Sequence, residues 1–235
     1  MRKNYYDTFY FEQRDHVDIH MAQAIRLLMK KHKLKKVLDV GCGTGRLVQW
    51  LQQHNFQAYG CDTAEKAVKI AKKITNNKVV KGSAQKLPFK TNSFDLITCI
   101  SVVEHLTQKQ VDMFLKEARR VLKKDGLIFL VTPNYATPLR YIQKEKWFGY
   151  SDPTHINFYT PTSLKSILKN HSFQNIQLYF ETTYDSPFDW DLPGFLRKLP
   201  KPLKTAITYL LIATPLLYIR NSFWIAGQKT KNEKN

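Results

Sequence analysis

One short stretch, KKVLDVGCGTGRL at residues 35–47, constrains the fold more than any other part of the sequence. Its apolar first half is typical of a buried strand in a parallel sheet, and Gly41, Gly43 and Gly45 follow it at alternate positions. Glycine adopts backbone conformations that a Cβ forbids, and it lets a ligand lie against the main chain. A helix is expected after the loop, and its free N–H groups attract negative or polar ligand groups. The stretch therefore predicts a nucleotide-type cofactor site.

The spacing of these glycines narrows the choice of cofactor. A dinucleotide loop has the pattern G-x-G-x-x-G, whereas this loop is G-x-G-x-G and follows Asp39. A carboxylate beside the loop repels a pyrophosphate but suits a cation, such as the ammonium group of an amino acid. The segment D-V-G-C-G-T-G resembles the first motif of class I S-adenosylmethionine (SAM) methyltransferases. A glycine-rich turn of some other α/β protein is the alternative interpretation.

The composition favours an ordinary folded domain. A chain of 235 residues with 43% hydrophobic residues can build the core of one elaborated α/β domain. The three cysteines, Cys42, Cys61 and Cys99, are odd in number and show no repeated spacing, which favours neither a disulfide framework nor a zinc site. Reduced thiols and a polar N-terminus without a secretory signal predict a cytoplasmic location.

The charge is strongly positive. There are 37 Lys and Arg against 19 Asp and Glu, which gives a net charge of +18. Such a field favours anionic partners, namely nucleic acid, anionic lipid or a phosphorylated substrate. Because the lysines are spread along the chain and form no basic arm, a generally lysine-rich surface explains the charge equally well.

Apolar runs alternate with amphipathic helical segments from residue 37 to residue 134, which predicts a parallel, doubly wound sheet. The helix that begins near Val111 is expected to end at a C-cap signal, Asp125-Gly126. The SFWIAGQ segment at 222–228 resembles the closing strand of the methyltransferase family. The resemblance implies a Rossmann-like sheet of seven strands, mostly parallel with an antiparallel last strand. The expected units are a helical cap (1–34), a SAM-binding core (35–181), a helical insertion (182–221), and a closing strand with a tail (222–235).

Further residues are expected to hold the cofactor. Asp62 ends the second strand about 20 residues after the glycine loop, where nucleotide folds place a carboxylate for the ribose hydroxyls; it can also cap the next helix. In the resembled family, residues after the third strand meet the adenine, here Ala84 and Gln85, although the usual acid is missing. Ile100 corresponds to a residue that lines the cofactor. The expected cofactor-binding set is Asp39, Gly41, Gly43, Gly45, Asp62, Ala84, Gln85 and Ile100.

Three residues are candidates for catalysis. The segment at 94–106 is similar to the F-D-h-h…h-E-H-h pattern (h, apolar) of ubiquinone-pathway and related small-molecule methyltransferases, and Glu104 and His105 occupy its E-H positions. His155 lies in a D-P-x-H segment that covers the mouth of the site in that family, and an imidazole can take a proton from a hydroxyl. The alternative is a structural role in loop hydrogen bonds for all three. His16 and His20 have the i, i+4 spacing of some metal pairs, but no third ligand follows, so no metal site is expected.

The insertion contains an apolar run at 205–219, shorter than the ~20 residues that span a bilayer. It is interpreted as a lid or buried helix over the site. An interfacial helix within 187–220, giving peripheral contact with the inner face of the membrane, is the alternative.

The sequence therefore predicts a SAM-dependent methyltransferase that produces S-adenosylhomocysteine and methylates an oxygen or nitrogen of a small, lipid-linked or glycan-linked substrate. The alternatives are an RNA-modifying methyltransferase, although no appended RNA-binding module is found, and a SAM-binding partner protein without catalytic activity.

Overall fold

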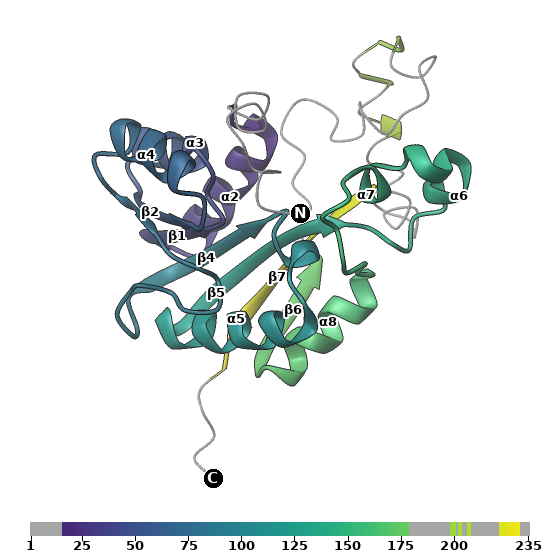
Figure 1. Cartoon of the computed structure of the whole chain (residues 1–235). Coiled ribbons are helices and arrows are strands. Elements are labelled where there is room, and N and C mark those ends of the chain that lie inside the picture. Colours follow the sequence, from purple (N-terminus) through teal and green to yellow (C-terminus); the bar gives the residue numbers. More distant parts are fainter. Residues whose placement is uncertain (1–15, 179–197, 201, 204–205, 208–220, 231–235) are drawn as a thin grey trace.

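The computed structural model describes residues 16–178, 198–200, 202–203, 206–207 and 221–230. Seven strands form one sheet in the order β3-β2-β1-β4-β5-β7-β6 (Figure 1). β3, β2, β1, β4 and β5 run parallel to one another, whereas β7 runs antiparallel to both β5 and β6. The expected sheet, mostly parallel with an antiparallel last strand, is confirmed. The strands are β1 (Lys36–Val40), β2 (Gln57–Asp62), β3 (Val79–Lys81), β4 (Phe94–Ile100), β5 (Leu122–Pro133), β6 (Phe173–Leu178) and β7 (Ser222–Lys229).

Helices cover both faces of the sheet, as a doubly wound fold requires (Figure 1). The helices α2, α3 and α4 pack against one face, and α5 and α8 pack against the other. The helical segments are α2 (Ile19–Lys31), α3 (Arg46–Gln53), α4 (Glu65–Ile74), η1 (Val103–His105), α5 (Gln108–Val121), α6 (Leu139–Gln143), η2 (Lys144–Lys146), α7 (Phe148–Ser151) and α8 (Pro161–Asn170).

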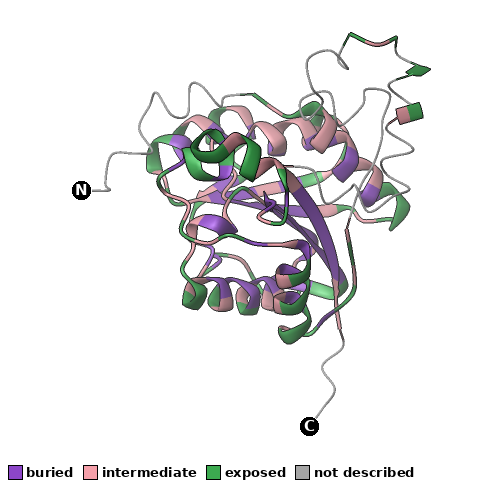
Figure 2. Cartoon of the chain, turned by 90° about the vertical axis from the view of Figure 1, so that its right-hand side faces the viewer, coloured by how far each residue is buried: buried purple, intermediate pink, exposed green. Residues whose placement is uncertain are grey.

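The sheet has a hydrophobic core on each side. Phe114 of α5 and Leu164 of α8 belong to one core, and Leu28 of α2 and Leu51 of α3 belong to the other. Each is at most 1% exposed, and full burial of such a side chain stabilises the fold by about 1.5–3 kcal/mol. The central strands are buried from both sides (Figure 2), which explains why their sequences are almost continuously apolar.

Local signals fix the beginnings of several helices. Asp18 caps α2 by accepting a hydrogen bond from the N–H of Met21. Thr160 caps α8 through a reciprocal capping box with Ser163, and Pro161 occupies the first helical position, as the sequence predicts.

The predicted end of α5 is wrong. The helix ends at Val121, and β5 begins at once with Leu122, which pairs with Phe94. Asp125 adopts a φ of +61° within the strand, beside a register shift between Phe94 and Leu96 of the partner strand. Asp125 and Gly126 therefore belong to an irregular strand start and do not cap a helix.

The fold brings the ends of the central strands together. Because β1, β2, β4 and β5 are parallel, their carboxyl ends meet at one edge of the sheet, which is where open α/β sheets bind ligands. The short helices α6 and α7 lie beside this edge (Figure 1). The expected insertion at 182–221 and its apolar run at 205–219 lie almost entirely outside the described residues. Within the described ranges, no helix combines the length and apolarity needed to cross a bilayer.

Candidate functional site

The glycine loop follows β1 directly and is held by backbone hydrogen bonds. The N–H of Gly41 donates to the carbonyl of Cys61 at 2.8 Å, and the N–H of Gly45 donates to that of Cys42 at 2.9 Å. Gly41, Gly43 and Gly45 have φ values of +77°, +51° and +80°. These values lie in the left-handed region, where only glycine avoids steric cost.

Close packing also requires glycine at two of these positions. A Cβ on Gly41 would lie 2.3 Å from Val102 Cγ2, and one on Gly45 would lie 2.9 Å from Ala71 Cβ. The first contact joins the glycine loop to the segment after β4. The second joins the start of α3 to α4. The loop is therefore clamped between its neighbours.

Asp62 extends this clamp from the end of β2. Its Oδ2 accepts a hydrogen bond from the N–H of Gly43 at 2.9 Å, and its Oδ1 accepts one from the N–H of Ala64 at 2.8 Å. Burial raises the pKa of this carboxyl, and the hydrogen bonds from Ala64, Gly43 and Thr63 partly oppose the shift. Asp62 thus both orders the turn into α4 and lies against the glycine loop.

Asp39 is a second buried carboxyl beside the loop. It is 5% exposed, and its Oδ1 accepts a hydrogen bond from the Thr98 hydroxyl at 2.8 Å. Burial raises the pKa of Asp39 to about 7, with a further contribution from the negative charge of Asp62. Two neighbouring carboxyls of this kind favour a ligand that brings hydrogen-bond donors or positive charge.

SAM fits this pair of acceptors. Its ammonium and ribose hydroxyl groups are donors, and its sulfonium is positive, so Asp39 and Asp62 offer the complementary acceptors. A pyrophosphate would place negative charge against the same two carboxyls.

The remaining cofactor candidates lie along the same edge of the sheet, where the strands have their carboxyl ends. Ala84, after β3, is 7% exposed and belongs to the core, and Gln85 is half-buried beside it. Ile100 is the last residue of β4 and is also half-buried. The structure thus places all three at or after the carboxyl ends of strands.

The three catalytic candidates are brought together at this edge. Glu104 and His105 lie in η1, and His155 lies between α7 and α8. A ligand atom from each of the three falls within 4.8 Å of the other two. The N–H groups of Ile156 and Asn157 both donate to the carbonyl of Glu104, at 2.9 and 3.0 Å. These two bonds hold the His155 segment over η1.

Glu104 has two oxygens in different environments. It is 1% exposed, and its Oε2 accepts a hydrogen bond from the Thr132 hydroxyl at 3.0 Å. Its Oε1 has no hydrogen-bond partner among the described residues and lies 4.0 Å from His155 Nε2. Burial raises the pKa of Glu104 to about 7, although the bond from Thr132 opposes the shift.

Hydrogen bonds fix both imidazole rings. His155 Nδ1 lies 2.8 Å from the Gly149 carbonyl, which can only accept, so Nδ1 carries the proton and Nε2 faces Glu104. The Thr154 hydroxyl donates to Asp152 at 2.6 Å, and its oxygen lies 2.8 Å from His105 Nδ1. His105 therefore donates from Nδ1.

Sequence reasoning missed the four residues that position these groups: Thr98, Thr132, Asp152 and Thr154. Thr98 and Thr132 interrupt apolar strand sequences near their carboxyl ends, and this polar interruption is the signal that could have found them. Asp152 and Thr154 belong to the same D-P-x-H segment as His155, but their link to His105 depends on the tertiary fold.

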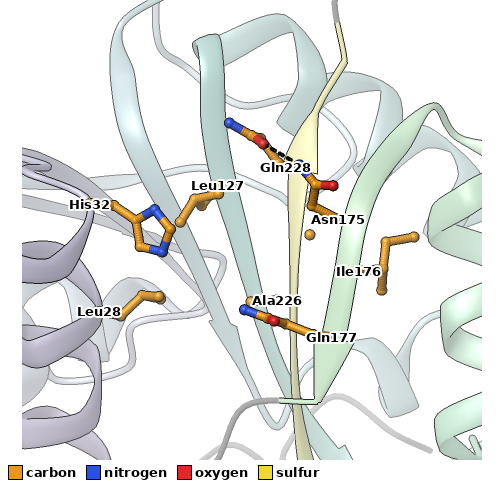
Figure 3. Close-up of a pocket in the computed structure, with 9 residues that line it drawn as sticks. Leu28, His32, Leu127, Asn175, Ile176, Gln177, Ala226 and Gln228 are labelled. Atoms are coloured by element: carbon orange, nitrogen blue, oxygen red, sulfur yellow. Dashed lines mark hydrogen bonds between the residues drawn. The ribbon is translucent and has the colours of Figure 1, made fainter.

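A separate pocket of about 400 Å³ lies away from this edge (Figure 3). Leu127 lines it from the first half of β5, and Gln177 and Gln228 line it from β6 and β7. No residue of the glycine loop or of the Glu104 cluster lines this pocket. It is therefore not the site predicted from the sequence.

Comparisons with known proteins agree with this geometry. The chain matches the family model of a methyltransferase domain over residues 10–178. A ubiquinone biosynthesis O-methyltransferase of Bartonella bacilliformis is 28% identical over 152 residues, which cover 60% of this chain and 60% of that protein. The matched stretch spans 37% to 60% of the length of the first curated relatives.

Solved structures share the fold. A SAM-dependent methyltransferase from Archaeoglobus fulgidus is 19% identical with a TM-score of 0.63, and the match covers 95% of this chain and 100% of that one. A phosphoethanolamine N-methyltransferase from Haemonchus contortus, solved with phosphomonomethylethanolamine and S-adenosylhomocysteine, is 18% identical with a TM-score of 0.57, over 89% of this chain and 53% of that one. At these identities the likeness concerns the fold alone.

Proposed function

Because the chain belongs to the class I SAM-dependent methyltransferases, we propose that it methylates a hydroxyl oxygen of a small or lipid-linked acceptor. SAM is the cofactor of this family, and it supplies an electrophilic methyl group on a sulfonium. The protein must hold the acceptor in line with that methyl group and exclude competing water. The observation that carries the proposal is the Glu104, His105 and His155 cluster at the same sheet edge as the glycine loop.

The cofactor half of the site is assigned to the glycine loop and the two carboxyls. Gly41, Gly43 and Gly45 let the cofactor approach the backbone, Asp39 faces its ammonium group, and Asp62 accepts from the ribose hydroxyls. Ala84, Gln85 and Ile100 line the adenine side. The raised pKa values of Asp39 and Asp62 support this assignment, because donors and positive charge relieve the cost of burying carboxylates.

The acceptor half is assigned to the cluster. A hydroxyl must lose its proton when it attacks the methyl group, whereas an uncharged amine attacks with its lone pair. Glu104 Oε1 accepts no hydrogen bond from any residue that the structure describes, and the His155 lone pair lies on Nε2, facing it. Two proton acceptors at one edge favour an oxygen nucleophile. The O-methyltransferase name of the Bartonella relative points the same way.

A lipid-linked acceptor is supported by the surface next to the site. Tyr141 and Ile142 of α6 are 66% and 77% exposed, and Phe148 of α7 is 39% exposed. Lys144 and Lys146 lie between these two helices. Exposed apolar and basic side chains together favour contact with an anionic lipid surface, which supports a peripheral membrane contact. Cosedimentation with anionic vesicles tests it, and an equal amount of protein in pellets with and without vesicles contradicts it.

The function is tested by separating cofactor binding from transfer. Calorimetric titration is expected to show binding of S-adenosylhomocysteine but not of NAD. Asp62→Ala is expected to weaken that binding at least tenfold, because each hydrogen bond to a charged group contributes about 1.5–3 kcal/mol. His155→Ala is expected to leave binding unchanged but to slow methyl transfer to a catechol or phenol acceptor by about 10²–10⁴-fold.

The outcomes separate the alternatives. Binding of S-adenosylhomocysteine with no transfer to hydroxyl, amine or RNA acceptors favours a partner protein that does not catalyse. Transfer to RNA alone favours the RNA-modifying alternative. Full transfer by His155→Ala removes that residue from the catalytic set.

A further inference from the structure

We infer that Glu104, His105 and His155 together bind a divalent first-row transition metal, so that the acceptor half of the site is a metal centre. The inference rests on the proposed function, because it concerns how the same site activates its acceptor. Each of the three residues offers one ligand atom, and these atoms lie within 4.8 Å of one another. Two imidazoles and one carboxylate are the donor set of many catalytic zinc and non-haem iron sites.

The first support is the unpaired oxygen of Glu104. Its side chain is 1% exposed, and Oε1 has no hydrogen-bond partner among the described residues. A buried oxygen without a partner is costly, and an ion is one of the few explanations for it. The nearest histidine nitrogen is 4.0 Å away, too far for a direct hydrogen bond. An ion between Glu104 Oε1 and His155 Nε2 would give each of these atoms a partner.

The second support is the way in which the histidines are held. Metal-binding histidines usually donate their other ring N–H to a carbonyl, a carboxylate or a polar relay, which fixes the ring and the tautomer. His155 Nδ1 lies against the Gly149 carbonyl. His105 Nδ1 lies against Thr154, whose hydroxyl donates to the Asp152 carboxylate. The hydrogen bonds from Nδ1 of both histidines are therefore of the kind that orient histidine ligands in metal sites.

The distances require only a small contraction. The ring centroids of His105 and His155 are 4.7 Å apart, with planes tilted by 55°, so the two rings are not stacked face to face. Ligand atoms about 2.1 Å from a tetrahedral metal lie about 3.4 Å from one another. Side-chain rotations would have to shorten the 4.0 Å between Glu104 Oε1 and His155 Nε2 by about 0.6 Å, and a separation of 4.8 Å by about 1.4 Å.

The donor atoms select the kind of metal. Imidazole nitrogens suit zinc, copper, iron and nickel, whereas magnesium, calcium and manganese prefer oxygen ligands. Three protein ligands leave at least one position open for the acceptor. With Glu104 Oε1 and His155 Nε2 bound to the metal, these atoms would no longer accept the proton; a hydroxyl bound at the open position would instead lose its proton to solvent, because the metal would lower its pKa. Its oxygen then bonds to the methyl carbon as the carbon–sulfur bond breaks, and the bonding electrons remain on sulfur.

Spacing along the sequence conceals this site. Glu104 and His105 are adjacent, and the third ligand is fifty positions later in the chain. The expectation of no metal site rested on His16 and His20, at i and i+4, whereas the fold joins two loops that are far apart in the sequence.

The test is direct metal binding to untagged protein that has been stripped with a chelator. Co²⁺ is the probe, because its visible absorption reports nitrogen and oxygen coordination. The wild type is expected to bind one equivalent saturably, and excess Mg²⁺ is expected to leave the spectrum unchanged. Glu104→Gln, His105→Ala and His155→Ala are each expected to weaken binding at least tenfold. His54→Ala, which removes an imidazole that contacts Trp50 instead, is the matched control and is expected to bind within twofold of the wild type.

Calorimetry with S-adenosylhomocysteine on the same metal-free samples distinguishes failure of the metal centre from failure of the proposed function. Intact cofactor binding without saturable Co²⁺ binding overturns the metal centre and leaves the proposed function standing. Co²⁺ binding that is equally tight in all three variants also overturns it. Loss of cofactor binding in folded wild type contradicts the proposed function instead. Circular dichroism confirms folding, and Glu104→Gln keeps the size of the side chain beside Thr132.

Discussion

At the scale of single residues, the site depends on carboxyl groups that are buried at strand ends. Asp39, Asp62 and Glu104 all have raised pKa values, and burial is the main cause in each. Each is held by a hydroxyl or backbone N–H from a neighbouring element. The sequence indicated the three acids, because Asp39 and Asp62 lie at the ends of apolar strand sequences and Glu104 follows another. It could not indicate Thr98 or Thr132, whose hydroxyl groups matter only once the strands are aligned.

Asp39 makes the stability of the ligand-free protein depend on pH. Its pKa is about 7 in the folded state against an ordinary value of 3.8, so the folded protein keeps a proton that the unfolded chain releases between these pH values. The free energy of unfolding is therefore expected to fall as pH rises from about 4 to about 7, by up to about 4 kcal/mol from this residue. Below that window Asp39 has no effect on the slope.

Asp39→Asn is the variant that tests this dependence. An amide cannot ionise, so the variant should gain stability relative to the wild type as pH rises from 4 to 7, in urea unfolding measured at several pH values. Glu104 contributes a slope of the same sign to both proteins and cancels in the difference. Parallel pH profiles for the two proteins would count against the raised pKa.

At the scale of elements, the glycine loop and the segment after β4 form one interlocked unit. Gly41 has a φ of +77°, and a Cβ there would meet Val102 at 2.3 Å. Gly41→Ala is therefore expected to destabilise the protein in two ways. The left-handed conformation costs about 1–2 kcal/mol, and overpacking against Val102 adds about 1–3 kcal/mol.

A double-mutant cycle separates these two costs. In Val102→Ala, the remaining Cβ would lie 3.5 Å from the new methyl group, which is an ordinary contact. The pair Gly41→Ala with Val102→Ala should therefore lose less stability than the sum of the two single variants, by about 1–3 kcal/mol in urea unfolding. Strict additivity would show that Val102 does not press on the loop.

Helix starts that capping residues mark in the sequence were predicted correctly. Boundaries that depend on pairing between strands were not. Thr160 and Pro161 mark the start of α8 in the sequence itself. The end of α5 was misplaced because Asp125-Gly126 resembles a helix stop, whereas pairing of Leu122 with Phe94 starts the strand earlier. The meeting of His155 with Glu104 likewise depends on two backbone hydrogen bonds between segments about fifty residues apart.

At the scale of the whole molecule, cofactor binding should stabilise the fold, because the site is built from the central strands β1, β2 and β4. S-adenosylhomocysteine at 100 times its dissociation constant is expected to add about 2.7 kcal/mol. For a domain of this size, that gain raises the melting temperature by roughly 5–10 °C.

The same measurement checks the role of Asp62. At the same ligand concentration, a tenfold weaker Asp62→Ala variant should show about half of that gain. NAD is the control ligand and should leave both melting temperatures unchanged. If the ligand raised the melting temperatures of the two proteins equally, Asp62 would not bind the ribose hydroxyls.

The position of β7 in the sheet has a consequence for synthesis of the protein on the ribosome. β6 is made first, yet its described neighbour in the sheet is β7, which lies between β6 and β5. A nascent chain that has not reached residue 222 therefore presents the open edge of β5 and an unpaired β6. Such edges recruit other chains. Until translation has passed β7, the incomplete sheet is therefore expected to be open to pairing with other chains, and slower translation would lengthen that exposure.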